Sequence, residues 1–231
     1  MKVGTANEAT RISWIKGVLS RIPAGSRILD AGAGERRFRS FCSHLNYVSQ
    51  DFARYDGKGD GRGLQTGSWN QDGLDIICDI SLIPESDSSF DSIMCIEVFE
   101  HLPNPHLALK EFSRLLRPGG WLILTAPFCS LTHFAPYHFY SGFNRYFYEN
   151  QLQEYRLDIL ELESNGNFFE YLAQEVRRIP SIMEQYAGSR PKLADRVAMS
   201  LLLKLLGRCS RNDHGSDAML CFGYHVLARK R

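Results

Sequence analysis

Two short stretches carry residues whose types and spacing could bind a ligand. In RILDAGAGERRF, an apolar run ends at Asp30 and enters a turn that contains Gly32 and Gly34. Glycines let the backbone of such a turn approach a ligand closely. The stretch 127–152, which leaves the end of the strand predicted at 121–127, is crowded with aromatic side chains. Aromatic side chains with a few polar groups are typical of a small-molecule pocket.

The glycine turn departs from two known nucleotide-binding motifs. A dinucleotide-binding loop needs a third glycine so that helix and strand pack closely, and Arg37 occupies that position. The phosphate-binding pattern GxxxxGK[ST] does not occur in the sequence. The turn therefore favours a ligand without a pyrophosphate, and a nicotinamide-dependent oxidoreductase is the weaker alternative.

Length and composition fit one domain spanning residues 1–231. The 231 residues are 44% hydrophobic and 23% charged, and the net charge of +1 gives no reason to expect nucleic-acid binding. The six cysteines are scattered, the N-terminus is too polar for a signal peptide, and no apolar run is long enough for a membrane span. We therefore expect a cytoplasmic protein. We expect no metal site, because no cluster stands at ligand spacing.

Strand-like and helical patterns alternate along the first part of the chain. Strands are predicted at 27–30, 46–51, 74–80, 91–98 and 121–127, and helices at 7–21, 38–45 and 106–120. This alternation predicts an α/β fold in which helices cover both faces of a mostly parallel sheet. Ligands then bind at the carboxyl ends of the strands.

The later part of the chain has a different pattern. Two further strands are predicted at 157–164 and 218–230, so the core comprises about 10–165 and 218–230, with a helical insertion at about 166–217. Within the insertion, 193–208 has an apolar helical face flanked by basic residues. That face either packs against the rest of the protein or makes a peripheral membrane contact.

Further polar residues stand where the later predicted strands end. Asp51 ends the second strand, where a carboxylate could accept both hydroxyl protons of a ribose. Asp79 and Ile80 end the third, a combination suited to the amino group and the face of an adenine. Glu97 and His101 follow the fourth. These residues would meet the glycine turn at one edge of the sheet.

As an ordered set, these motifs resemble the class I S-adenosylmethionine-dependent methyltransferases, most closely the broad type-11-like group that acts on small molecules. The resemblance rests on strand-DxGxG, the acidic second strand, D-[IL]…LP, FD…EVxEHL and LRPGG, and it covers roughly 10–165. It implies a Rossmann-like, seven-stranded sheet with an antiparallel last strand. One departure is Arg36, where the family usually has the last glycine of DxGxGxG. Arginine there could bind the cofactor carboxylate or force a different loop path.

The resemblance also implies S-adenosylmethionine as the cofactor and names its binding residues. The methionine end would contact the loop after the first strand, the ribose Asp51, and the adenine Phe52 and the third strand end. The implied cofactor-binding residues are Asp30, Ala31, Gly32, Gly34, Asp51, Phe52, Asp79, Ile80 and Glu97.

The implied reaction is methyl transfer to a small molecule or to a glycan or lipid-linked precursor. We favour an oxygen acceptor because histidines cluster at the predicted pocket, with His133 and His138 as candidate bases. The remaining pocket residues are predicted to be His101, Phe128, Tyr137 and Tyr140. In the alternative interpretation these histidines bond backbone carbonyls and only hold the loop together. A non-catalytic cofactor-binding or partner-binding module also stays open.

Overall fold

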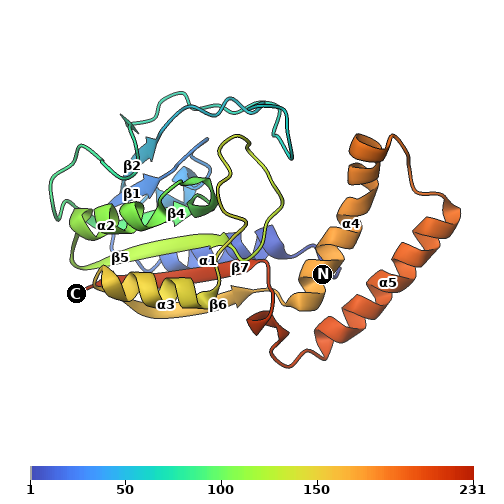
Figure 1. Ribbon diagram of the computed structural model, residues 1–231. Helices are drawn as coiled ribbons and strands as arrows, with labels where there is room; N and C mark the ends of the chain where they lie inside the picture. The colour runs from blue at the N-terminus through green and yellow to red at the C-terminus, as the bar shows by residue number, and fades with distance from the viewer. Residues whose placement is uncertain (1) are drawn as a thin grey trace. The chain divides into compact units, whose positions relative to one another are not determined.

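The computed structural model describes residues 2–231 and contains a seven-stranded sheet (Figure 1). The sheet order is β3-β2-β1-β4-β5-β7-β6. Its strands are β1 (Arg27–Ala31), β2 (Asn46–Asp51), β3 (Ile76–Ile77), β4 (Phe90–Ile96), β5 (Leu116–Pro127), β6 (Leu157–Asn165) and β7 (Gly223–Lys230). The pairs from β3 to β5 are parallel, and β7 runs antiparallel to β5. The predicted fold class is confirmed.

Five α-helices accompany the sheet in the described chain. They are α1 (Asn7–Leu19), α2 (Pro105–Leu115), α3 (Arg145–Glu154), α4 (Phe168–Ala187) and α5 (Leu193–Arg211). Figure 1 shows α1 on one face of the sheet and α2 and α3 on the other. Both faces of the central strands are therefore covered, which explains their nearly continuous apolar sequences.

The packing of α1 shows how the apolar pattern builds the core. Ile15 and Leu19 of α1 lie in one cluster with Ile28 of β1, Met94 of β4 and Ile123 of β5. Each of these residues is at most 1% exposed to solvent. Neighbours of the strand residues in sequence point to the opposite face, as the pleat of a strand requires.

The strand order places a ligand site at one edge. β1 is flanked by β2 on one side and β4 on the other, so the chain changes direction across the sheet between β1 and β4. The crevice outside the carboxyl ends of two such strands is where open α/β sheets bind ligands. The glycine turn after β1 and Glu97 after β4 both lie at that edge.

The described chain forms two compact units. One contains Ser13–Glu163 and Gly223–Arg231, and the other contains Ser164–Phe222 with the residues up to Ile12. The second unit has a small core of Ala173, Val176 and Leu206. Its helices α4 and α5 lie between β6 and β7 in sequence, where a helical insertion is predicted. Within residues 2–231, no helix is both long enough and apolar enough to cross a membrane.

Several predicted elements differ from the structure. The helix predicted at 106–120 ends at Leu115 and β5 begins at Leu116, while the last strand begins at Gly223 and not at 218. Residues 38–45 form only a 3-10 turn (Arg39–Cys42), and Phe38 before it has no side chain that can cap the backbone N–H groups of a helix. The third strand shrinks to Ile76–Ile77 at the edge of the sheet. The aromatic stretch 127–152, interpreted as a loop, ends in the first turns of α3, whose Tyr148 is fully buried.

Candidate functional site

The glycine turn after β1 is held by β2. Gly32 N and Ala33 N both donate to the backbone carbonyl of Gln50, at 2.9 and 2.8 Å. Gly32 has a φ of +76°, and a Cβ there would lie 2.5 Å from Cγ2 of Val98. Glycine is therefore required at this position by the protein's own packing. A larger residue at position 32 would disturb the fold, so a loss of ligand affinity in such a variant would not identify a ligand contact.

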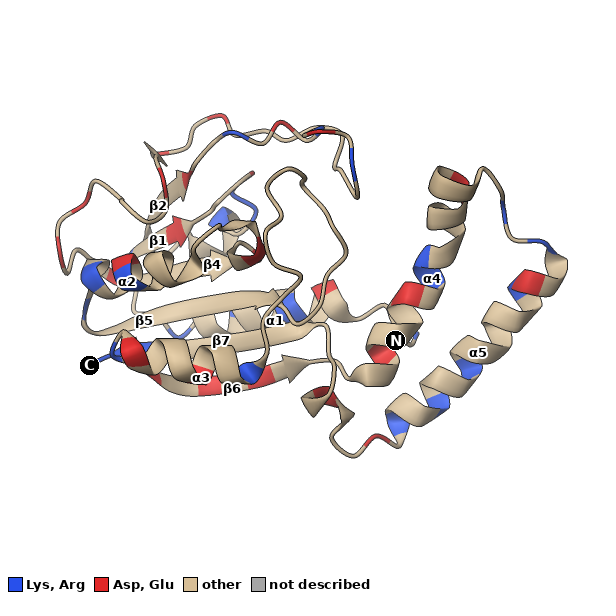
Figure 2. Ribbon diagram, in the orientation of Figure 1, with Lys and Arg blue, Asp and Glu red and all other residues tan. Residues whose placement is uncertain are grey.

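Asp51, at the carboxyl end of β2, organises the backbone around it. Its Oδ2 accepts from Gly34 N at 2.8 Å, and its Oδ1 accepts from Ala53 N at 2.9 Å. The side chain of Gln71 donates to the same Oδ1 at 3.3 Å. The carboxylate is 6% exposed and lies directly beside the glycine turn. Figure 2 shows acidic positions at the ends of β1 and β2.

Asp30 lies deeper than the turn that it precedes. It is 2% exposed, and Oη of Tyr47 donates to its Oδ2 at 2.5 Å. Burial raises the pKa of Asp30 to about 7, the hydrogen bond from Tyr47 lowers it, and the charge of Asp51 raises it. In this structure Asp30 is therefore bound to β2 through Tyr47.

A segment of the loop between β2 and β3, residues 69–73, lies across the glycine turn. A Cβ on Gly34, whose φ is +49°, would lie 2.6 Å from Cζ2 of Trp69. The carboxylate of Glu35 accepts from Asn70 N at 2.9 Å. The sequence contains no motif that identifies Trp69 as a neighbour of the turn, and its position was not predicted.

Arg36 connects the glycine turn to the same segment. Its backbone has a φ of +56°, and its Nη1 donates to the carbonyl oxygen of Gly73 at 2.7 Å. Arginine thus adopts the left-handed conformation that a glycine adopts more easily. The side chain thus contacts the 69–73 segment, and a bond from Arg36 to the cofactor carboxylate stays a prediction. Together with Gln71 on Asp51, this contact holds the segment over the turn.

The ends of β3 and β4 supply the remaining predicted cofactor residues. Asp79 is exposed and accepts from the backbone and hydroxyl of Ser81, which lower the pKa of Asp79. Ile80 beside it is buried. Glu97 has a φ of +55° and accepts from the hydroxyl of Thr125 at 2.9 Å. A non-glycine residue in this conformation costs energy and is found preferentially at functional sites.

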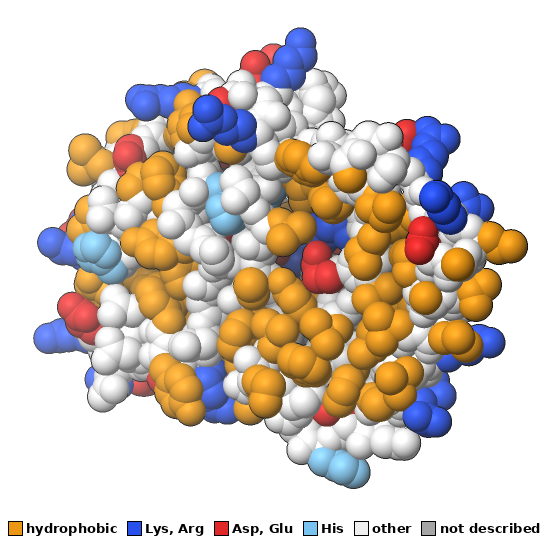
Figure 3. Space-filling model, turned by 45° about the vertical axis from the view of Figure 1, so that its right-hand side comes forward, with side chains coloured by type: hydrophobic (Ala, Val, Ile, Leu, Met, Phe, Trp, Pro, Cys, Tyr) orange, Lys and Arg blue, Asp and Glu red, His pale blue; other side chains and the backbone are white. Residues whose placement is uncertain are grey.

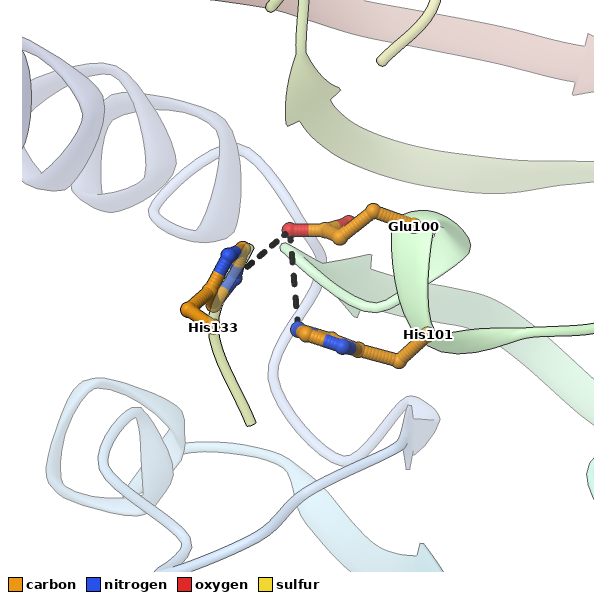
Figure 4. A group of neighbouring side chains, drawn as sticks. All are labelled: Glu100, His101 and His133. Atoms are coloured by element: carbon orange, nitrogen blue, oxygen red, sulfur yellow. Dashed lines mark ion pairs between the residues drawn. The ribbon is translucent and has the colours of Figure 1, made fainter. Parts of the chain in front are cut away.

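Three side chains from two loops converge beside this edge (Figure 4). Nε2 of His101 and Nε2 of His133 each lie 3.8 Å from Oε1 of Glu100. Glu100 is 1% exposed, whereas His101 and His133 are 13% and 23% exposed at their side chains. Burial, and then the nearby His133, lower the pKa of His101 to about 3, against a hydrogen bond to Tyr137 that raises it. His101 is therefore neutral at physiological pH.

His138 completes a group of three imidazoles. Its ring centroid lies 4.8 Å from that of His133 and 6.0 Å from that of His101. Nε2 of His138 is 3.1 Å from the hydroxyl oxygen of Ser130. Burial and the nearby His133 lower the pKa of His138. The EVxEHL motif contains Glu100, but its approach to His133 depends on the path of the loop after β5.

The aromatic residues predicted for the acceptor pocket have separate neighbours. Phe52 meets Tyr137 edge to face, with ring centroids 5.0 Å apart. Tyr140 donates to the carbonyl of Pro103, and Phe128 lies 6.0 Å from the ring of Tyr224. Their role in binding an acceptor stays a prediction.

An aromatic cluster that sequence reasoning missed connects the two loops at the site. Phe134 stacks on Tyr55 with ring centroids 4.4 Å apart and meets Trp69 at 5.1 Å. Phe134 also stacks on the ring of His101 at 5.0 Å. The loop after β2 and the loop after β5 are thereby joined over the carboxyl ends of the strands.

The chain is similar in sequence to known methyltransferases. A methyltransferase-domain family matches residues 8–179. Among curated relatives, the ubiquinone biosynthesis O-methyltransferase of Dechloromonas aromatica is 30% identical over 118 residues, which cover 50% of this chain and 49% of the relative. That of Paracidovorax citrulli is 40% identical over 45 residues, covering 20% and 19%. The chain thus spans about half or less of the length of these curated relatives.

Solved structures share the fold at low identity. The [4+2]-cyclase SpnF is 16% identical with a TM-score of 0.59, covering 98% of this chain and 83% of that one. Phosphoethanolamine N-methyltransferase 2 of Haemonchus contortus, in complex with S-adenosyl-L-methionine, is 15% identical with a TM-score of 0.54. That match covers 96% of this chain and 52% of the other. At these identities the similarity shows the architecture alone.

Proposed function

The chain belongs to the methyltransferase-domain family, within the class I S-adenosylmethionine-dependent group, and on that premise we propose that it methylates a small molecule at an oxygen atom. The cofactor part of the proposal rests on Asp51, held at the carboxyl end of β2 against the backbone of Gly34, and the oxygen acceptor is supported by the similarity to O-methyltransferases. An ionised carboxylate only accepts hydrogen bonds, so the paired hydroxyls of a ribose suit it. The acceptor is a small molecule, or a glycan or lipid-linked precursor.

The residues at the strand ends fit the cofactor's other parts. The exposed carboxylate of Asp79 and the buried side chain of Ile80 offer an acceptor and an apolar surface to an adenine ring. The turn Ala31–Gly34 and Glu97 lie where the methionine portion would extend. Gln71 must leave Asp51, or share it, when the ribose binds.

The bound cofactor supplies an electrophilic methyl carbon on a sulfonium. The acceptor oxygen attacks that carbon, the carbon–sulfur bond breaks, and its electron pair stays on the sulfur of S-adenosylhomocysteine. The acceptor's proton must go to a base, and the imidazoles of His133 and His138 are the candidates. The aromatic cluster of Tyr55, Trp69 and Phe134 can exclude water from this reaction.

Calorimetry with S-adenosylmethionine and S-adenosylhomocysteine tests the cofactor assignment. Asp51→Asn removes the charge while keeping the side-chain shape, and losing a charged hydrogen bond costs about 1.5–3 kcal/mol, or roughly ten- to a hundred-fold in affinity. Asp87→Asn, an acidic residue 77% exposed at its side chain, is the matched control and should bind normally. Equal affinities in the two variants would contradict the assignment of Asp51.

The base is tested after candidate acceptors have been screened for production of S-adenosylhomocysteine. His133→Ala or His138→Ala should reduce turnover by about 10²–10⁴-fold if that imidazole takes the proton, with cofactor affinity unchanged. If both variants keep normal turnover and the acidic limb of the pH profile, neither residue is the base. Methyl transfer would then depend on positioning.

The α4–α5 unit offers a surface for a lipid bilayer, and we propose that the outer face of α5 contacts anionic headgroups. Leu193, Val197 and Leu201 on that face are 79%, 51% and 60% exposed. Basic side chains accompany them at Lys204 and Arg208. Figure 3 shows many exposed hydrophobic side chains on the face that it presents, with lysines and arginines around them. Apolar and basic side chains on one helix suit such a surface.

Co-sedimentation with vesicles tests this contact. Vesicles of phosphatidylcholine with phosphatidylglycerol should bind the protein, and Leu201→Ser should weaken binding. Leu82→Ser, at a leucine 77% exposed outside α5, is the control. Equal binding by both variants, or a concentration-dependent dimer that covers this face, would contradict the membrane contact.

The six free cysteines support a reducing compartment such as the cytoplasm.

A further inference from the structure

Backbone carbonyls fix the hydrogen positions of two histidines in the cluster around Glu100. Nδ1 of His101 lies 2.6 Å from the carbonyl oxygen of Tyr137, and Nδ1 of His133 lies 2.8 Å from that of Leu131. A carbonyl oxygen can only accept, so each Nδ1 carries the hydrogen and donates it. In a neutral imidazole the lone pair is then on Nε2. These are the two nitrogens that point toward Glu100.

With neutral imidazoles and an ionised Glu100, each of the three facing atoms can donate an electron pair to a metal ion. One possible ligand atom from each of the three residues lies within 4.8 Å of the others, and each Nε2 is 3.8 Å from Oε1 of Glu100. A carboxylate oxygen and two imidazole nitrogens that face one another form a ligand set that divalent transition metals favour. We propose that Glu100, His101 and His133 bind a divalent transition-metal ion such as Zn²⁺.

The surroundings of the three residues resemble those of metal ligands. Histidines that bind metals usually donate their other ring nitrogen to a carbonyl or carboxylate, which orients the ring, and both histidines here do so. The ring of His101 is further held by stacking on Phe134. Ligand atoms about 2.0–2.2 Å from a tetrahedral zinc lie about 3.4 Å apart, so the two 3.8 Å nitrogen–oxygen distances need a small contraction. All three ligand atoms lie within 4.8 Å of one another, so the two imidazoles must also come closer together to bind one ion.

Two nitrogens and one carboxylate oxygen leave a tetrahedral ion with a fourth position open. Such a position is typical of catalytic rather than structural zinc sites. The partial exposure of His133 leaves the site reachable from solvent. A catalytic role for the metal rests on the proposed methyl transfer. In that role the metal would bind the acceptor's hydroxyl oxygen at the open position and lower the pKa of the hydroxyl. His133 then serves as a ligand, and His138 next to it takes the released proton.

Metal binding is measured on untagged protein, first stripped with a chelator. Titration calorimetry with Zn²⁺ alone should show one ion per chain, and His133→Ala and Glu100→Gln should each weaken binding by at least about a hundred-fold. Co²⁺ should give the visible absorption of a four-coordinate site without a thiolate band. The experiment is done in a Cys129→Ser background, because Cys129 is exposed and thiolates bind both metals.

The control and outcomes separate this proposal from the methyltransferase activity. His106→Ala, at an exposed histidine in α2, should leave Zn²⁺ binding unchanged. No stoichiometric Zn²⁺ binding, or binding that survives in both His133→Ala and Glu100→Gln, overturns the metal site. Affinity for S-adenosylmethionine, measured on the stripped protein, is an independent readout. A protein that binds Zn²⁺ here but not the cofactor keeps the metal site and rejects the proposed function.

Discussion

Replacing the buried Asp30 by asparagine should stabilise the protein, and more so at higher pH. Asp30 is 2% exposed, and burial raises its pKa from 3.8 to about 7. The asparagine side chain is neutral and has the same shape, and its amide oxygen can still accept the hydrogen bond from Tyr47. The substitution thus removes the cost of a buried charge while keeping its main partner.

The size and sign of the effect follow from proton linkage. Between pH 4 and pH 7 the unfolded chain has released the proton of Asp30 while the folded protein still binds it. The wild type therefore loses stability as pH rises through this window and levels off above the folded pKa. In this window the free energy of unfolding of the wild type falls by about 1.4 kcal/mol for each pH unit. From pH 5 to pH 7 it therefore falls by about 3 kcal/mol.

Urea unfolding of wild type and Asp30→Asn at pH 5 and pH 8 measures this difference. The stability gained by the variant should be larger at pH 8 by about 3 kcal/mol. Asp87→Asn, whose parent side chain is 77% exposed, should show no such growth. A gain for Asp30→Asn that is equal at both pH values, or larger at pH 5, would refute the assignment of a raised pKa.

Three further substitutions test the glycine turn and the segment above it. Gly32→Val, with φ +76° and Val98 2.5 Å from the new Cβ, should destabilise by more than about 3 kcal/mol, and an unchanged thermal melt would contradict the packing. Gly34→Ala should displace Trp69, which lies 2.6 Å from the new Cβ, and make residues 69–73 more susceptible to proteolysis; unchanged cleavage would argue against the contact. Arg36→Gly should speed amide exchange in the same segment, because it loses the bond to Gly73, and wild-type protection would show that the bond is unimportant.

The sheet could be predicted from the sequence because its central strands are apolar on both faces. The runs ending at Asp30 and Asp51 became β1 and β2, and the order of acidic strand ends indicated the ligand edge. The 3-10 turn at 39–42 was missed because an apolar pattern does not show whether a helix start is capped, and Phe38 provides no side-chain cap. Short edge strands such as β3 are likewise set by pairing and not by periodicity.

The details of the site depended on loops that carry no periodic signal. Asp51 was correctly placed at a strand end, but its bonds to Gly34 and Gln71 require the fold of the loop after β2. The approach of His133 to Glu100 requires the path of the loop after β5. Local spacing can reveal a metal site only when its ligands share one helix or one turn. For that reason the cluster at Glu100 was not anticipated.

Phe134 contacts both the segment over the glycine turn and the Glu100 cluster, so the position of one loop influences the position of the other. Its ring lies against Trp69 of the segment over the glycine turn and against His101 of the Glu100 cluster. A ligand that lifts the segment away from Asp51 therefore removes a neighbour from the ring that orients His101. Occupancy on one side then changes the free energy of binding on the other, and the change is equal in both directions. Order of addition would leave the ternary complex unaltered, while each ligand's dissociation constant would depend on the other's concentration.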